Sequence, residues 1–100
     1  MANKVFLNAQ LYGMYEDASF LLRSPLSRKI LEALSSSEQP LAPLQIAKKA
    51  NMARSNVSTK LIELKKRGFA ECVNPNDRKW RFYRITDKGK RILKEAQKLT

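Results

Sequence analysis

Apolar residues return every three to four positions in the middle of the chain, which is the spacing of one helix face. Ser24 followed by Pro25 favours a helix start, and the apolar positions behind this pair predict a first core helix that ends near Ser35. After a polar break, Pro43 can open a short second helix. Asn51 is expected to close this second helix in a left-handed conformation.

A third helix is expected to begin three residues later and to stop at Gly68. Its apolar positions share one side of the helix and are Val57, Leu61 and Leu64. The opposite side is polar with a single acidic residue, and it consists of Ser55, Asn56, Thr59, Glu63 and Lys66, with Lys60 and Arg67 on a flank. One side of this helix is therefore predicted to pack inward, and the polar side is left exposed.

Beyond Gly68 the apolar spacing changes, and two strands are predicted, at residues 69–73 and 80–85. The Asn-Pro-Asn-Asp sequence at 74–77 is typical of the turn between them, so the two strands form a hairpin. Thr86 then caps a last helix. This order predicts an α+β fold of the winged helix-turn-helix type, with a three-helix core, a two-stranded wing hairpin, an extra N-terminal segment and a C-terminal helix.

Three regions follow from this prediction. Residues 1–23 form an apolar N-terminal leader, which we expect to be a dimerisation helix because it has too many apolar groups for one helical stripe. Residues 24–86 form the winged helix-turn-helix domain, and residues 87–100 form a C-terminal helix that covers the core and contributes to dimerisation.

The composition excludes several classes of function. The 100 residues suffice for one small domain, and they include no histidine and one cysteine, Cys72. An imidazole base, an internal disulfide and a thiolate zinc site are therefore excluded. We find no catalytic constellation and no glycine-rich phosphate loop, so we expect neither an enzyme nor a metal or cofactor. No stretch reads as a signal peptide or a membrane span, so we expect a cytoplasmic protein.

Positive charge is concentrated in the second half of the chain. Lys and Arg number 20 against 9 Asp and Glu, which gives a net charge of +11. Residues 1–43 are neutral overall, whereas residues 44–73 carry an excess of five positive charges and residues 74–100 an excess of six. An excess that starts at the predicted helix-turn-helix indicates a surface that binds a polyanion such as DNA.

The third helix can enter the major groove of double-stranded DNA, where side chains reach base edges. We expect base contacts from Ser55, Asn56, Thr59 and Lys60, among which Asn56 suits an adenine edge and Lys60 suits guanine acceptors. Phosphate contacts are expected from Lys48, Lys49 and Arg54. On the wing we expect backbone or minor-groove contacts from Arg78, Lys79 and Arg81. An ion pair of Asp77 with Arg78 or Lys79 could hold the hairpin, and the two roles can coexist.

Residues 53–91 (ARSNVSTKLIELKKRGFAECVNPNDRKWRFYRITDKGKR) resemble the recognition helix, wing and closing helix of MarR-type regulators. The more specific part is NPNDRKWRFYRITDKG, with an acidic and basic wing tip and a Thr-acid-basic-Gly closing segment. The upstream stretch FLLRSPLSRKILEAL is similar to the first core helix of ArsR-type and PadR-type regulators. The resemblance implies a transcriptional regulator, and where MarR-type wings usually carry arginine this chain has Lys79, so Arg78 can take that role. It does not decide whether a small-molecule effector binds.

The resemblance and the apolar leader both favour a homodimer that presents two recognition helices about one DNA turn, roughly 34 Å, apart. The residues expected at the dimer contact are Phe6, Leu7, Leu11, Tyr12, Tyr15, Leu93, Ala96 and Leu99. The sequence thus predicts a nucleoid-associated regulator, most simply a repressor that blocks a promoter. Two alternatives stay open: a winged helix that binds proteins in a transcription or repair assembly, and a chromatin-coating protein that binds DNA without sequence preference.

Overall fold

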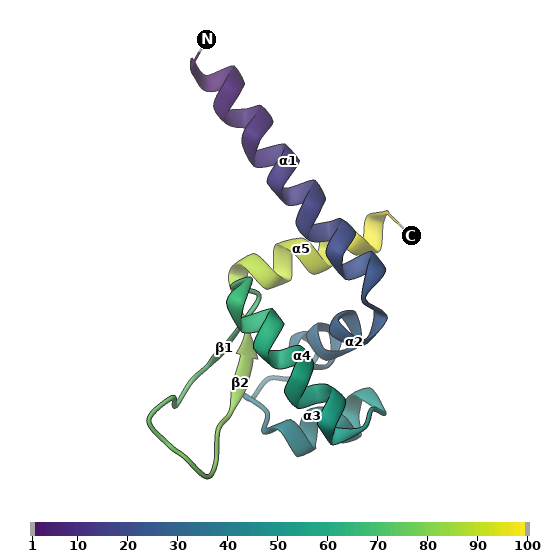
Figure 1. Cartoon of the computed structure of the whole chain (residues 1–100), viewed down its shortest axis with the longest axis vertical. Coiled ribbons are helices and arrows are strands. Elements are labelled where there is room, and N and C mark those ends of the chain that lie inside the picture. Colours follow the sequence, from purple (N-terminus) through teal and green to yellow (C-terminus); the bar gives the residue numbers. More distant parts are fainter. Residues whose placement is uncertain (1, 100) are drawn as a thin grey trace.

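The computed structural model describes the backbone of residues 2–99 and the side chains of residues 13–99. Its elements are α1 (Ala2–Arg23), α2 (Pro25–Ser35), α3 (Pro43–Ala50), α4 (Arg54–Lys66), β1 (Ala70–Cys72), β2 (Tyr83–Ile85) and α5 (Asp87–Lys98) (Figure 1). The two strands form an antiparallel hairpin. This arrangement confirms the predicted α+β winged-helix fold.

The core lies where α2, α3, α4 and the hairpin meet α5. The predicted inward positions of α4, Val57, Leu61 and Leu64, are all buried there. Phe69, between α4 and β1, is fully buried and is the largest such side chain among the described residues. Burying a side chain of this size contributes roughly 2–3 kcal/mol. Only one side of α4 packs against this core, and the opposite side of α4 faces outward.

Three of the predicted helix ends are confirmed. Asn51 closes α3 with a left-handed φ of 54°, and Gly68 follows α4 with a φ of 78°. The Thr86 hydroxyl oxygen accepts a hydrogen bond from the Gly89 backbone N–H at 3.0 Å, which caps α5. Ser24 precedes α2 as its N-cap residue, as predicted, but its hydroxyl donates to the Ser27 hydroxyl at 2.8 Å and makes no cap hydrogen bond.

The predicted strands at 69–73 and 80–85 are too long. The paired register covers only three residues on each side, from Ala70 opposite Ile85 to Cys72 opposite Tyr83. Beyond this, the Asn74 side chain replaces part of the ladder, because its amide oxygen accepts from the Phe82 N–H at 2.8 Å and its amide nitrogen donates to the Trp80 carbonyl. The outer part of the wing is therefore a loop fixed by a side chain.

Tyr83 also pairs on its other edge. It exchanges two backbone hydrogen bonds with Leu41, at 2.8 and 2.9 Å, in an isolated bridge. The sequence analysis did not predict this bridge, which ties the α2–α3 connection to the base of the wing. The wing is thus anchored to the helical core from both sides.

α1 extends away from the other helices at its N-terminal end and packs on α5 at its C-terminal end (Figure 1). Leu21 is fully buried in the same core as α2 to α4. The Asp17 carboxylate lies 3.9 Å from the Arg67 guanidinium and 4.0 Å from the Lys88 amine. The division of the chain at residue 23 stays a prediction. Within the described part of the chain, no helix is both long and apolar enough to cross a membrane.

Candidate nucleic-acid interface

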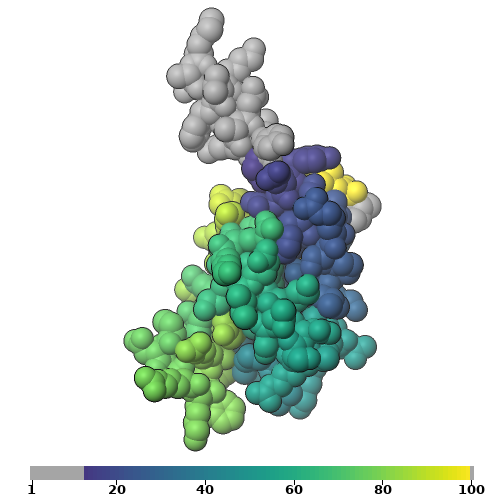
Figure 2. Space-filling model, viewed as in Figure 1, coloured from purple at the N-terminus to yellow at the C-terminus, as the bar shows by residue number. Residues whose placement is uncertain are grey.

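The outward side of α4 carries the residues expected to read bases. Ser55, Asn56 and Thr59 are exposed and Lys60 is partly buried. α4 has 13 residues, so it is about 20 Å long, enough to lie across several base pairs of a major groove. Figure 2 shows the surface of α4 across the middle of one face of the molecule, with the wing projecting beside it. The helix is accessible along this whole side.

The polar side chains on α4 differ in which hydrogen-bond donors and acceptors they leave free. The Thr59 hydroxyl donates to the Ser55 carbonyl oxygen at 3.0 Å, so its free functions are its acceptor lone pairs and its methyl group. The Asn56 side-chain amide makes no hydrogen bond within the part of the chain that the structure describes. Asn56 therefore retains both a donor and an acceptor for a bidentate contact with an adenine edge.

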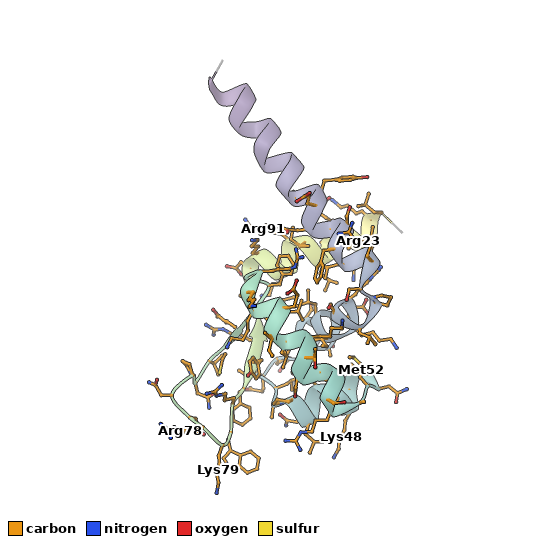
Figure 3. The ribbon with its side chains drawn as sticks, in the orientation of Figure 1. Arg23, Lys48, Met52, Arg78, Lys79 and Arg91 are labelled. Carbon is orange, nitrogen blue, oxygen red and sulfur yellow. The ribbon has the colours of Figure 1, made fainter. Side chains whose placement is uncertain are left out.

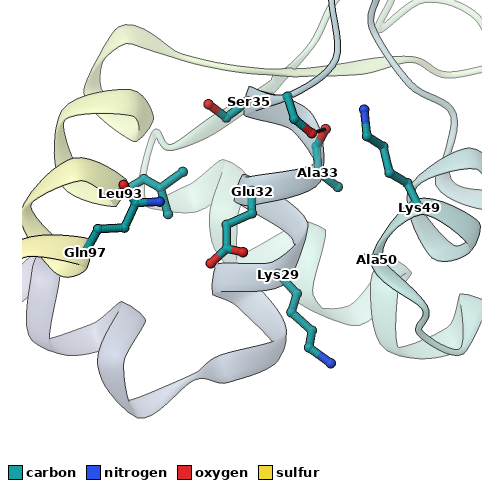
Figure 4. A pocket seen from close by; sticks show the side chains of 9 residues that line it. Lys29, Glu32, Ala33, Ser35, Lys49, Ala50, Leu93 and Gln97 are labelled. Carbon is teal, nitrogen blue, oxygen red and sulfur yellow. Dashed lines mark hydrogen bonds between the residues drawn. The ribbon is translucent and has the colours of Figure 1, made fainter. Parts of the chain in front are cut away.

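The residues expected at phosphates do not all lie together. Arg54 begins α4 and is exposed, and Lys48 lies at the α3 end of the molecule (Figure 3). Lys49 instead lines a hollow between α2, α3 and α5, together with Lys29 and Glu32 (Figure 4). No residue of α4 lines this hollow. Lys48 and Arg54 are therefore placed near the start of α4, whereas Lys49 points to another surface.

The wing tip is organised by Asp77 through backbone contacts. One carboxylate oxygen accepts from the N–H groups of Lys79 and Trp80, at 2.9 and 2.8 Å. The Arg81 guanidinium donates to the Asp77 carbonyl oxygen at 3.0 Å. No ion pair of Asp77 with Arg78 or Lys79 occurs among the described residues, so the hairpin is not held by such a pair. Both cations project from the tip of the wing (Figure 3).

Among the described residues, the cations on α3, α4 and the wing loop have no acidic partners, a property they share with Arg23, Lys29 and several lysines and arginines of α5. Ion pairs join Arg28 to Glu32, Arg67 to Glu63 and Asp17, Arg84 to Glu71, Lys88 to Asp17, and Lys98 to Glu95. Within the described residues, no carboxylate lies within 4.0 Å of any cation on α3, on α4 or on the wing loop between the strands, namely Lys48, Lys49, Arg54, Lys60, Lys65, Lys66, Arg78, Lys79 and Arg81. These cations keep their full charge for an external anion.

Arg67 is half-buried and already has partners within the chain. Its guanidinium nitrogen lies 3.0 Å from the Glu63 carboxylate, and its guanidinium carbon lies 3.7 Å from the centre of the Phe20 ring. It therefore ties the end of α4 to α1. Glu63, the one acid on the polar side of α4, is neutralised by this contact and does not repel an approaching anion.

A groove between α4 and the wing is lined by Lys66 and Arg81, which were expected on this surface, and by Ile62 and Lys65, which were not selected from the sequence. Ile62 is 60% exposed. Counting 100° per residue from the buried positions would have placed Ile62 outward. An aliphatic residue next to Leu61 and Leu64 is easily taken for part of the core, and for this reason it was missed.

The residues expected at a dimer contact fall into three groups. Tyr15 is 64% and Leu99 is 50% exposed, so both are accessible. Leu93 and Ala96 are buried within the single chain, as part of its own core. The side chains of Phe6, Leu7, Leu11 and Tyr12 lie outside the described residues. The dimerisation role of these residues stays a prediction.

Comparison with known proteins adds a family. Residues 25–100 match the family model described as winged helix-turn-helix. The PcaV transcriptional regulator from Streptomyces coelicolor is 27% identical, with a TM-score of 0.64 over 74% of this chain and 52% of that chain. The transcriptional repressor CouR, solved bound to a 23-mer DNA duplex, is 26% identical, with a TM-score of 0.67 over 99% and 72% of the two chains.

A transcription regulator of the MarR family is 22% identical, with a TM-score of 0.68 over 97% of this chain and 64% of that chain, and shows the fold alone. These similarities confirm a winged helix-turn-helix and a fold like that of a MarR-family regulator, as the sequence resemblance implied. The chain spans about half the length of PcaV and less than two thirds of the MarR-family regulator. The sequence matches none of the curated proteins with which it was compared.

Proposed function

This chain belongs to the winged helix-turn-helix family, and on that premise we propose that it is a transcriptional regulator that binds double-stranded DNA at specific sequences. In this proposal α4 lies in the major groove, and the wing contacts the backbone or the adjacent minor groove. The protein acts in the cytoplasm at the nucleoid as a homodimer, and it represses by occupying a promoter. CouR, a repressor of similar structure, was solved on a DNA duplex, which supports the choice of partner.

One observation carries the proposal: the exposed side of α4 is bordered by cations at the end of α3, on α4 itself and on the wing loop, and among the described residues none of these cations has a carboxylate within 4.0 Å. An unpaired cation gains most from a phosphate, because binding releases condensed counterions from DNA without breaking an internal ion pair. The same surface exposes a helix with short polar side chains, which is the shape that a major groove admits.

The geometry supports a division of roles between residues that give sequence specificity and residues that give affinity. Asn56 lies on the exposed side of α4, and its free amide suits a base edge. Arg78 lies at the wing tip, away from α4, where a phosphate or the minor groove is the accessible target (Figure 3). Contacts of the first kind distinguish sequences, and contacts of the second kind strengthen binding to all of them.

The experiment that tests the proposal is a binding titration of the full chain against a randomised duplex library, followed by selection and sequencing of the bound fraction. We expect a recurrent motif with two half-sites about one DNA turn apart, and competition by random duplex that is at least about 1,000-fold weaker. Binding of all duplexes with equal affinity would instead indicate a chromatin-coating protein. Absence of duplex binding at low salt would refute the proposal and leave protein binding as the function of the winged helix.

The oligomeric state is tested separately. Sedimentation equilibrium is expected to give the mass of two chains, and the DNA complex is expected to contain two chains per motif. A monomer that binds a single half-site would contradict the homodimer but not the DNA-binding function. Repression is tested with a reporter gene placed behind the selected motif, whose expression should fall when the protein is produced.

A further inference from the structure

Ile62 is an outlier on the exposed side of α4. Ser55, Thr59 and Ile62 are spaced by four and three residues, so they lie along one side of the helix. The other apolar residues of α4, Val57, Leu61 and Leu64, are buried, whereas Ile62 is 60% exposed. A single exposed aliphatic residue is ordinary on most surfaces. This one lies on the side that the proposed function places in the major groove, next along it after Thr59.

Ile62 stands between two grooves with mixed linings. On the wing side it borders a groove with Lys66 and Arg81, and also with Pro43, Leu61 and Tyr83. On the other side it borders a second groove, with Thr59 and Lys60, and also with Phe20. Ile62, itself 60% exposed, therefore forms an apolar ridge between two depressions that carry both polar and apolar groups. An apolar group that meets this ridge can be buried against the aliphatic side chain while polar groups beside it remain paired or hydrated.

Ile62 lies three residues beyond Thr59 on the same side of α4. With a rise of 1.5 Å per residue, the two are about 4.5 Å apart along the helix, which is between one and two base-pair steps of about 3.4 Å. A base pair next to the one that Thr59 meets is therefore within reach of Ile62. The C5 methyl of thymine is the apolar group that a base pair presents in the major groove.

We propose that Ile62 is a specificity-determining residue that contacts the C5 methyl of one thymine in each half-site. The inference rests on the proposed function and deepens it by naming one base. Uracil lacks only this methyl, and cytosine presents an amino group in its neighbourhood, so both are bound less well than thymine. Burying one methyl group against an aliphatic side chain corresponds to an affinity gain of about three- to five-fold.

The test uses the duplex motif that selection from a randomised library returns with the full-length wild-type protein. Each thymine of this motif is replaced singly by deoxyuridine, and the dissociation constant is measured by fluorescence anisotropy. We expect one thymine in each half-site whose replacement weakens wild-type binding by about three- to five-fold. Ile62→Ala should bind the thymine and uracil duplexes equally well, and Ile62→Val should keep most of the preference because it retains a branched aliphatic side chain.

Val73→Ala is the matched control, because Val73 is also an exposed β-branched residue, but it lies beside β1 and not on α4. Its thymine-to-uracil ratio should equal that of the wild type. The inference is overturned if no thymine of the motif responds to removal of its methyl, or if the response persists in Ile62→Ala. A motif with normal affinity but no methyl response leaves the proposed function standing, whereas failure to obtain any motif removes both.

Discussion

Removal of the Arg78 charge is expected to weaken DNA binding by an amount that depends on salt. Arg78 is exposed at the wing tip and has no carboxylate partner among the described residues. If it neutralises one phosphate, Arg78→Ala lowers the slope of log affinity against log salt by about 0.9 for each protomer bound. When salt rises from 50 to 200 mM, the fall in affinity is then smaller for the variant than for the wild type, by about three- to four-fold for one such contact and about 12-fold for a homodimer with one contact in each half-site, because fewer counterions are released.

Anisotropy titrations of a labelled duplex at four or more salt concentrations give the slope for each protein. Lys29→Ala is the control, because it removes the same unit of charge from α2, beside a hollow that no residue of α4 lines (Figure 4). Its slope should equal that of the wild type. Parallel lines for wild type and Arg78→Ala, or an equal change of slope in Lys29→Ala, would refute a phosphate contact by the wing tip.

Three further changes test the base contact and the fold. Asn56→Ala should cost about 1–3 kcal/mol on the selected motif and little on random duplex, measured by competition; equal losses on both would contradict a base contact. Gly89→Ala should lower the free energy of unfolding in urea by at least about 1–3 kcal/mol, because the added Cβ would overlap the Phe69 carbonyl oxygen. Gly13→Ala is its control: nothing lies within 4 Å of a Cβ added at Gly13, so this change should leave stability unchanged or raise it. Thr86→Ala should lower stability by about 1 kcal/mol through loss of the α5 cap, a loss that Thr86→Ser should largely avoid.

Helix positions could be predicted because their determinants are local. Pro25 and Pro43 open α2 and α3, and Asn51 and Gly68 supply the positive φ that ends α3 and follows α4. The strand lengths could not be predicted, because they depend on a contact eight residues apart. Alternating side chains predicted a strand from residue 80, but the Asn74 side chain occupies the hydrogen-bonding groups of Trp80 and Phe82. A side chain that takes the place of a backbone strand partner in this way leaves no periodic pattern in the sequence.

The exposed side of α4 could be predicted from the sequence, but the partners of individual cations could not. The polar side of α4 follows from the positions of Val57, Leu61 and Leu64, because a helix that buries one side exposes the other. Whether a cation is paired depends on residues distant in the sequence. Arg67 meets Asp17 and Phe20 on α1, and Lys49 turns toward α2 and α5, so neither could be placed by counting along one helix.

The claim on which the account depends is that α4 occupies the major groove while the wing meets the backbone beside it. Dimethyl sulfate footprinting of the selected duplex tests it directly, because the reagent methylates guanine N7 in the major groove and adenine N3 in the minor groove. We expect protection of guanine N7 in two patches about one DNA turn apart, lost in part by Asn56→Ala. Full reactivity of every guanine N7 in a duplex saturated with protein would show that α4 does not enter the groove.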